Sequence, residues 1–192
     1  MKKSILSLVL AVVTGFTATA ATPIDGVKKE VKTAESTVTW KGYKVTGSHY
    51  GTVALKKGAL VFDGDKLTGG EFVVDMTTLI ATDLEGEYRT KLEGHLKSDD
   101  FFGVANNPTS KLIFKKVKAS GKNSYKVTGD LTIKGITKPV TFDISVYGNK
   151  ATASLKVDRS LYNVQYGSGS FFDNLGDKTI YDEFDLVVDL AF

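Results

Sequence analysis

The chain has 192 residues, a formal net charge of +3 and no cysteine. The absence of cysteine excludes disulfide bonds, thiolate metal sites and lipidation of an N-terminal cysteine. Lys2 and Lys3 fall in a leader, and without them the formal charge drops from +3 to +1. The charge therefore does not indicate a nucleic-acid partner or an anionic membrane surface.

The first twenty residues have the pattern of a secretory signal peptide. A basic start at Met1–Lys3 precedes the apolar stretch Ile5–Val13, and Ala18–Ala20 reads as an A-x-A cleavage site. A transmembrane anchor is the alternative, but it requires about 20 apolar residues, and this run ends at Thr14. The sequence therefore predicts a signal peptide over residues 1–20 and a mature protein that is periplasmic or secreted.

Two further segments follow the leader. Residues 21–35 are polar, carry mixed charge and contain a proline and a glycine, so we expect a mobile arm. Residues 36–192 are long enough for one domain with a single substantial core, and they show no internal repeat.

Most of that domain alternates between apolar and polar residues, which is typical of half-buried antiparallel strands. Asp63–Asp65 is a hairpin signal, Lys56–Gly58 reads as a turn, and Gly42 suggests a bulge. The predicted strands cover residues 37–45, 50–55, 59–62, 71–76, 111–118, 125–134, 138–147, 150–158 and 184–192.

One segment departs from this alternation. In the stretch LEGEYRTKLEGHLKSDDFF (residues 84–102), apolar side chains recur at helical spacing, which predicts a helix from Leu84 to Leu96 with a stripe that includes Tyr88. Ser98 is expected to cap a further short turn, with Phe101–Phe102 folding under it. A lone amphipathic helix among strands has to lay its stripe on a sheet or across a barrel mouth.

About eight strands with one dry face could form either a sandwich or a barrel. Regular hairpins, and a long final strand free to pair with the first, favour the barrel. The predicted fold class is thus all-β with one main helix, as an eight-stranded antiparallel β-barrel. Such a barrel is just wide enough to be filled by side chains or to hold one small ligand.

The chain has only two histidines, and neither predicts a metal centre. His95 and Asp99 are four residues apart and could begin a site, but two ligands do not complete one. We expect them to hydrogen-bond at the helix end, and we expect His49 to pack in a loop. No nucleophile with a neighbouring base is evident. The sequence therefore predicts no enzyme, no metal and no cofactor.

Five blocks of the sequence resemble the YceI-like family, a group of lipid- or polyisoprenoid-binding proteins. The blocks span nearly all of the predicted domain in matching order. They are WKGYKVTGSH (residues 40–49), LTGGEFVVDM (67–76), GHLKSDDFF (94–102), GDLTIKGITKPV (129–140) and VDR (157–159).

This resemblance implies a lipocalin-like barrel whose interior takes a long isoprenoid chain, such as a polyprenyl or quinone tail. From the alternation and the helix we expect an apolar wall. Arg159 has a planar fork of donors, so it could hold a lipid headgroup or form a salt bridge to Asp75 or to neighbours of Asp158. The candidate ligand-binding residues are Trp40, Phe72, Val74, Met76, Leu92, Leu96, Phe101, Phe102, Phe142, Arg159 and Leu186.

The predicted function is an exported carrier of an isoprenoid lipid or quinone, as a monomer or homodimer. Two other hypotheses stay open at this point. The first is a secreted structural or stress-response barrel whose interior is filled and binds nothing, and the second, which the residues favour less, is a hydrolase. Each methylene that a carrier buries contributes about 0.8 kcal/mol, so an apolar interior alone would suffice for binding.

Overall fold

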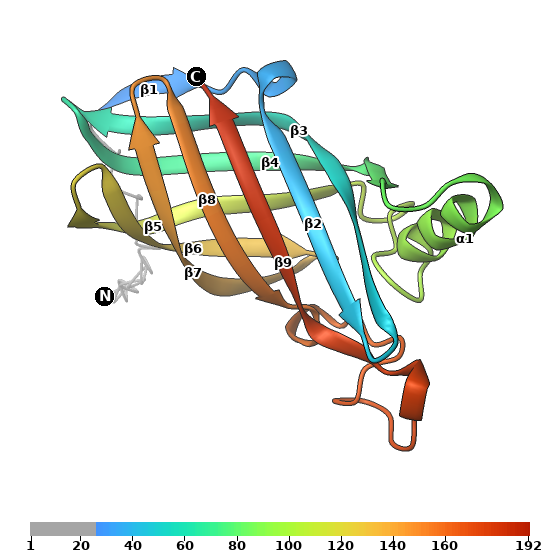
Figure 1. Cartoon of the computed structure of the whole chain (residues 1–192). Helices are drawn as coiled ribbons and strands as arrows, with labels where there is room; N and C mark the ends of the chain where they lie inside the picture. Colours follow the sequence, from blue (N-terminus) through green and yellow to red (C-terminus); the bar gives the residue numbers. More distant parts are fainter. Residues whose placement is uncertain (1–25) are drawn as a thin grey trace, which may run out of the picture.

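The protein is a closed antiparallel β-barrel with one α-helix at one end (Figure 1). The structure is a computed structural model that describes residues 26–192, so the predicted signal peptide lies outside the described residues. The elements are β1 (Val27–Glu30), β2 (Thr37–Lys44), β3 (Gly47–Asp63), β4 (Lys66–Ala81), α1 (Gly86–Lys97), β5 (Thr109–Gly121), β6 (Ser124–Ile133), β7 (Ile136–Tyr147), β8 (Lys150–Asp158) and β9 (Ile180–Ala191), with short 3-10 turns at Thr33–Glu35, Arg159–Tyr162 and Gly176–Lys178.

Eight strands close the barrel in the order β3-β2-β9-β8-β7-β6-β5-β4, and β4 pairs back onto β3. The last strand pairs with the first long strand, since Val38 lies opposite Val188 and Trp40 opposite Leu186. The predicted fold class is thus confirmed, including closure between the two ends of the domain. Because closure leaves no free edge among these eight strands, their inward faces form one shared interior.

The expected turn at Lys56–Gly58 is wrong. These residues lie inside β3, which runs without interruption for 17 residues, and the β3–β4 register shifts between Leu55 and Lys57. The bulge lets Lys56 and Lys57, two consecutive residues, both face water. Gly58 then allows β4 to approach, because a Cβ there would lie only 2.6 Å from the ring of Phe72.

The residues expected to form a mobile arm are partly ordered. Val27–Glu30 forms β1, which pairs antiparallel with the end of β3. The amide of Val31 donates to the carbonyl of Gly58 at 2.8 Å, and that of Lys32 donates to Ala191 at 2.8 Å. Residues 27–30 of the expected arm are therefore part of the sheet, and residues 31–35 are held to the barrel by these backbone hydrogen bonds and a 3-10 turn.

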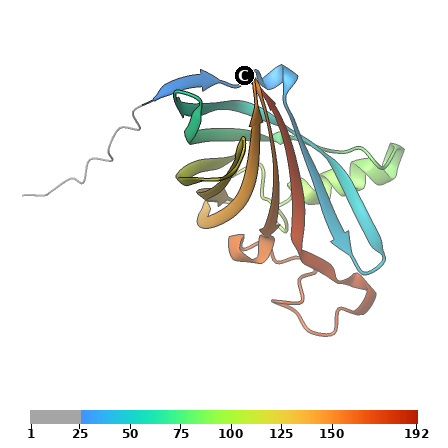
Figure 2. The ribbon, with the colours of Figure 1, turned by 60° about the vertical axis from the view of Figure 1, so that its left-hand side comes forward.

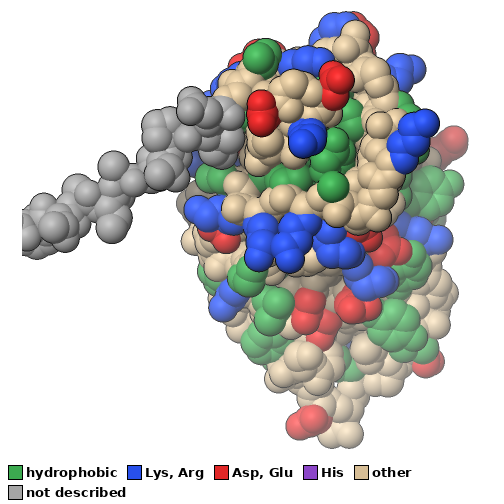
Figure 3. Space-filling model, turned by 90° about the vertical axis from the view of Figure 1, so that its left-hand side faces the viewer, with side chains coloured by type: hydrophobic (Ala, Val, Ile, Leu, Met, Phe, Trp, Pro, Cys, Tyr) green, Lys and Arg blue, Asp and Glu red, His purple; other side chains and the backbone are tan. Residues whose placement is uncertain are grey.

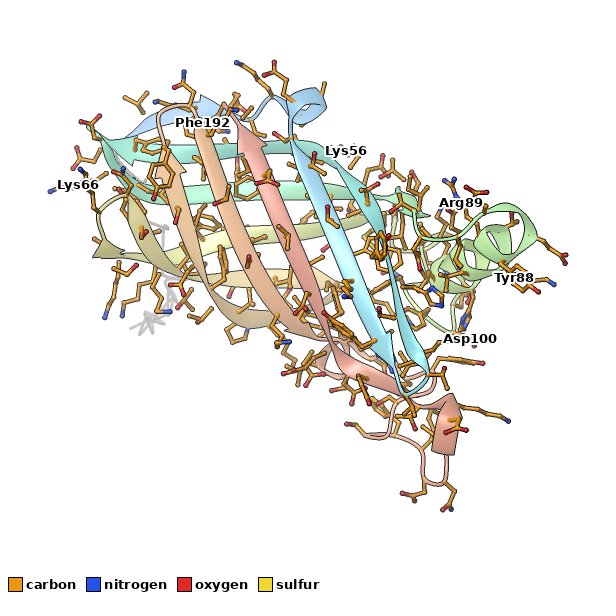
Figure 4. All side chains as sticks on the ribbon, viewed as in Figure 1. Lys56, Lys66, Tyr88, Arg89, Asp100 and Phe192 are labelled. Atoms are coloured by element: carbon orange, nitrogen blue, oxygen red, sulfur yellow. The ribbon has the colours of Figure 1, made fainter. Side chains whose placement is uncertain are left out.

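Helix α1 begins two residues later than expected, and only part of the expected stripe is buried: Leu92 and Leu96 pack on the core, but Tyr88 does not. Tyr88 is 77% exposed, and Figure 4 shows it on the outer side of α1. The contact face instead combines Leu96 with Glu93, which accepts a hydrogen bond from the amide of Ala81 and one from Arg89 Nε. Contact with the end of β4 thus turned the first turn of α1 so that Tyr88 faces water despite its apolar spacing.

The segment after α1 folds under the helix as expected, but through a different cap. Ser98 ends α1, and the amides of Phe101 and Gly103 donate to its carbonyl in the expected turn. Its hydroxyl does not cap that turn, because it donates to the carbonyl of His95. The chain then bends so that Phe101 is buried against the core. Figures 1 and 2 place α1, the β2–β3 hairpin and the loop before β9 at the same end of the barrel.

Candidate binding cavity

The half of the barrel nearer α1 contains a cavity of about 170 Å³. Its wall is almost entirely apolar and includes inward side chains from all eight barrel strands. Ten of the eleven candidate ligand-binding residues lie on this wall, and the exception is Leu92. Leu92 is partly buried against the core and does not line the cavity. Whether any of the eleven contacts a ligand stays a prediction.

The inward side chains around the cavity are less buried than their position suggests. Val74, Met76, Leu186 and Val188 all point inward, yet each is only partly buried. A tightly packed barrel would leave such residues without accessible surface. Their residual accessible surface shows that the space between them is not filled by side chains.

The other half of the barrel is packed solid. Inward residues such as Leu60 and Val127 are 0% exposed, and neither belongs to the cavity wall. At the far end Phe62 and Phe192 stack with ring centroids 5.6 Å apart, and Lys29 Nζ lies over both rings. Figure 4 shows Phe192 at this end, and Figure 3 shows the same end with hydrophobic side chains set among charged ones.

Arg159 lies at the mouth of the cavity, where its guanidinium joins three segments. It is 2% exposed, and it donates to the carbonyl oxygens of Val164 (2.7 Å), Ile180 (2.9 Å) and Tyr181 (3.1 Å). Its guanidinium carbon also lies 5.3 Å from the ring centroid of Phe101. Burial lowers the pKa of Arg159, although an arginine stays protonated at any physiological pH.

Arg159 forms a salt bridge, but with a partner other than those expected, and whether it also contacts a headgroup stays a prediction. Its charged partner is Asp182, whose Oδ1 lies 3.4 Å from Nη2, and not Asp75 or a neighbour of Asp158. Asp182 in turn accepts from Ser170, and Asp158 accepts from the amide of Ser160. The guanidinium therefore anchors the loop before β9, and most of its donors are engaged within the protein.

A second polar group lies on the outer face of the barrel and joins β2, β8 and β9. Tyr43 Oη donates to Asp185 Oδ2 at 2.5 Å, and Lys156 Nζ lies 3.1 Å from Asp185 Oδ1. The hydrogen bond from Tyr43, and then the one from Lys156, hold the pKa of Asp185 below its ordinary value. Since Tyr43 is a donor to an ionised carboxylate, its own pKa is raised.

The two histidines do not converge on a common site. His49 Nδ1 lies 2.8 Å from Asp83 Oδ2, which holds the start of β3 against the end of β4. The expected hydrogen bond between His95 and Asp99 is not present; the ring of His95 instead meets Tyr166 and Phe101 edge-on, at centroid distances of 4.3 and 5.7 Å. Among residues 26–192, no cluster of three His, Cys, Asp or Glu side chains is arranged to hold a metal ion.

Several wall residues were not singled out from the sequence. Phe184 shares the inward face of β9 with Leu186, so the same alternation could have identified it. Phe114 carried a weaker signal, because the β5–β6 register shifts between Phe114 and Lys116 and interrupts the alternation along that strand. No sequence pattern indicated that the cavity would stop at Phe114.

Comparison with known proteins identifies a family. The YceI-like domain matches residues 29–192. A UPF0312 protein of Shewanella denitrificans is 35% identical over 91 residues, which is 47% of this chain and 46% of that protein. A UPF0312 protein of Pseudomonas putida strain W619 is 35% identical over 99 residues, 52% of this chain and 50% of that one. The chain thus matches about half the length of these curated relatives.

Solved structures share the fold at lower sequence identity. BcnA of Burkholderia cenocepacia aligns with a TM-score of 0.66 and 24% identity, covering 84% of this chain and 99% of that one. A polyisoprenoid binding domain from Saccharophagus degradans, implicated in plant cell wall breakdown, aligns with a TM-score of 0.58 and 11% identity, covering 86% and 97%. Within the described residues, no helix has the length and hydropathy needed to span a membrane.

Proposed function

Because the chain belongs to the YceI-like domain family, we propose that it is a binding protein that carries a long-chain isoprenoid lipid in its barrel. The observation that carries this proposal is the apolar cavity of about 170 Å³ inside a closed barrel. A solved neighbour with the same fold is described as a polyisoprenoid binding domain, which supports the same class of ligand for this chain.

The distribution of polar groups indicates that the tail of the ligand supplies the binding energy. At the mouth, the guanidinium of Arg159 donates to three backbone carbonyls. A headgroup at the mouth would have to break these contacts to gain new ones. Each buried methylene contributes about 0.8 kcal/mol without such a cost, so a polyprenyl chain and a quinone tail are both suitable.

The two alternatives explain the interior less well. A barrel filled for purely structural reasons would be packed in both halves, whereas the half beside α1 is hollow. A hydrolase needs a nucleophile beside a base, and the guanidinium of Arg159, at the mouth, already holds structural contacts. Binding is the function that this site supports best.

We also propose that the protein acts outside the cytoplasm, in the periplasm or as a secreted protein. This rests on the leader pattern of residues 1–20 alone. Mass spectrometry of the N-terminus of the protein from its native host is the test. A mature chain that begins near Ala21 supports the proposal, and an intact Met1 contradicts it.

Filling the cavity tests the carrier function directly. Val74→Trp places a large ring in the cavity, whereas Val73→Trp places the same ring on the outer face of the adjacent position in β4. We expect the first variant to lose most of its affinity for a polyprenol while the second binds like the unchanged protein. Thermal unfolding of both variants reports whether they are folded.

The outcome separates a carrier from a filled barrel. If the cavity is a binding site, Val74→Trp costs affinity and little stability. If instead the interior tolerates no occupant, the ring overpacks the core and costs about 1–3 kcal/mol of stability. A loss of stability together with no polyprenol binding by the unchanged protein contradicts the proposed function.

A further inference from the structure

The cavity ends at a sharp boundary halfway along the barrel. On two pairs of neighbouring strands, a wall residue lies directly opposite a fully packed residue that does not reach the cavity. Phe142 of β7 lies opposite Val127 of β6, and Leu190 of β9 lies opposite Ala151 of β8. Val127 is 0% exposed and Ala151 is 1% exposed. The hollow part of the barrel is therefore a closed-ended pocket.

Phe114 forms the centre of the floor of that pocket. Its ring packs against Phe72 and Phe142, with centroid distances of 5.7 and 5.6 Å, so three aromatic rings lie across the barrel. The position of Phe114 depends on Gly70, because a Cβ there would lie 2.9 Å from the ring of Phe114 and 3.2 Å from Leu60. Phe114 thus sits between the cavity on one side and the packed residue Leu60 on the other.

The depth above this floor can be read from β9. Wall residues run from Ile180 at the mouth to Leu190 at the floor. Ten residues at about 3.4 Å each, on strands tilted by about 40°, give roughly 26 Å along the barrel axis. A volume of about 170 Å³ spread over this depth is narrow, so it accepts one chain and not two side by side.

We infer that the floor at Phe114 makes the barrel selective for the length of the chain that it carries. This inference rests on the proposed carrier function. It adds the ligand feature that the site selects, which is a single apolar chain no longer than the depth of the pocket. A shorter chain leaves apolar wall uncovered, and a longer one leaves its excess outside the mouth in water. Affinity therefore rises with chain length and stops rising once the pocket is full.

The test uses prenyl alcohols of increasing length, namely geraniol, farnesol, geranylgeraniol and longer polyprenols, competing with a fluorescent apolar probe. For the unchanged protein we expect affinity to increase with each isoprene unit up to a break and then to level off. In Phe114→Ala the break moves to a longer alcohol. The first alcohol beyond the original break then binds about tenfold more tightly than it does to the unchanged protein, because about two carbons of its last unit become buried.

Two further variants keep the test decisive if Phe114→Ala folds poorly. Ala153→Leu fills the wall between Ile144 and Val188, near the floor, and moves the break to a shorter alcohol. Phe102→Ala is the control, because Phe102 lies near the mouth, 6.4 Å from Phe184 by ring centroids. It weakens all the alcohols and leaves the break in place.

The possible failures are distinguishable. An unchanged protein that binds the alcohols with no break, or a break that neither Phe114→Ala nor Ala153→Leu moves, overturns the length selection and leaves the carrier function standing. An unchanged protein that binds none of the alcohols contradicts the carrier function as well. Circular dichroism of each variant shows that the barrel is intact.

Discussion

The two halves of this barrel are built from the same strands but do different things. Beside the termini, inward side chains such as Leu60 and Val127 have no exposed surface, whereas beside α1 Leu186 and Val188 border a cavity. The packed half resembles the core of any small domain, and it supplies stability. The hollow half gives up part of that stability, and it supplies the space that a ligand needs. Stability and binding are thus separated along one axis.

The largest expected effect comes from changing one leucine to alanine in each half and comparing the losses in the free energy of unfolding. Leu60→Ala creates a cavity where neighbours cannot collapse, and it should lower the free energy of unfolding by about 3 kcal/mol. Leu186→Ala only enlarges an existing cavity, so its cost should be about 1 kcal/mol. Urea unfolding of the two variants gives both values. Equal losses would show that the two halves are packed alike.

The second test of the difference between the two halves changes Arg159 at the mouth of the cavity. Arg159→Met keeps much of the side-chain volume but leaves the carbonyls of Val164, Ile180 and Tyr181 without their donor. We expect a loss of about 2 kcal/mol in unfolding free energy, because buried carbonyls without partners are costly. Limited proteolysis should then cut within residues 163–179 before the strands. Arg159→Lys, which restores one charge, should recover only part of the loss.

A smaller effect is expected at Asp185. Its pKa is lower in the folded protein because Tyr43 donates to it, so its ionised form stabilises the fold at pH values above the unfolded pKa of about 3.9. That contribution is lost as the pH falls through the lower folded pKa. The carboxylate is about a third exposed, so Tyr43→Phe should cost well under about 1 kcal/mol at pH 7.

Unfolding of Tyr43→Phe across a pH series checks this sign. The difference from the unchanged protein should be largest near neutral pH and should shrink below about pH 4. A difference that grows on acidification would contradict the assignment of Tyr43 as donor to an ionised Asp185. Tyr43 borders the cavity, but this variant removes only the hydroxyl that donates to Asp185. It should therefore bind polyprenols with little change.

The sequence predicted the barrel well because alternation reports directly which face of a strand is dry. Trp40, Phe72 and Leu186 were placed inside on that ground, and all three lie on the cavity wall. Predictions from local composition and spacing were wrong where tertiary contacts determine the conformation. Lys56–Gly58 has the composition of a turn but is a bulge in a continuous strand, and Tyr88 has helical spacing but faces water.

Arg159 shows a different limit. Its place at the end of an apolar strand was visible in the sequence, but its partners are carbonyl oxygens from residues 164, 180 and 181. Backbone carbonyls carry no sequence signature, because every residue has one. Whether Arg159 would anchor a loop or hold a ligand therefore depended on where the chain returned after residue 163.

The sequence by itself determined the inward and outward faces, the closure of the barrel and the family, since each follows from local alternation or from the order of motifs. Only the tertiary structure decided where the interior is empty. A side chain fills space according to its neighbours across the barrel, and those neighbours come from distant strands. Gly70 on β4 makes room for the ring of Phe114 on β5, and that one contact places the floor of the cavity.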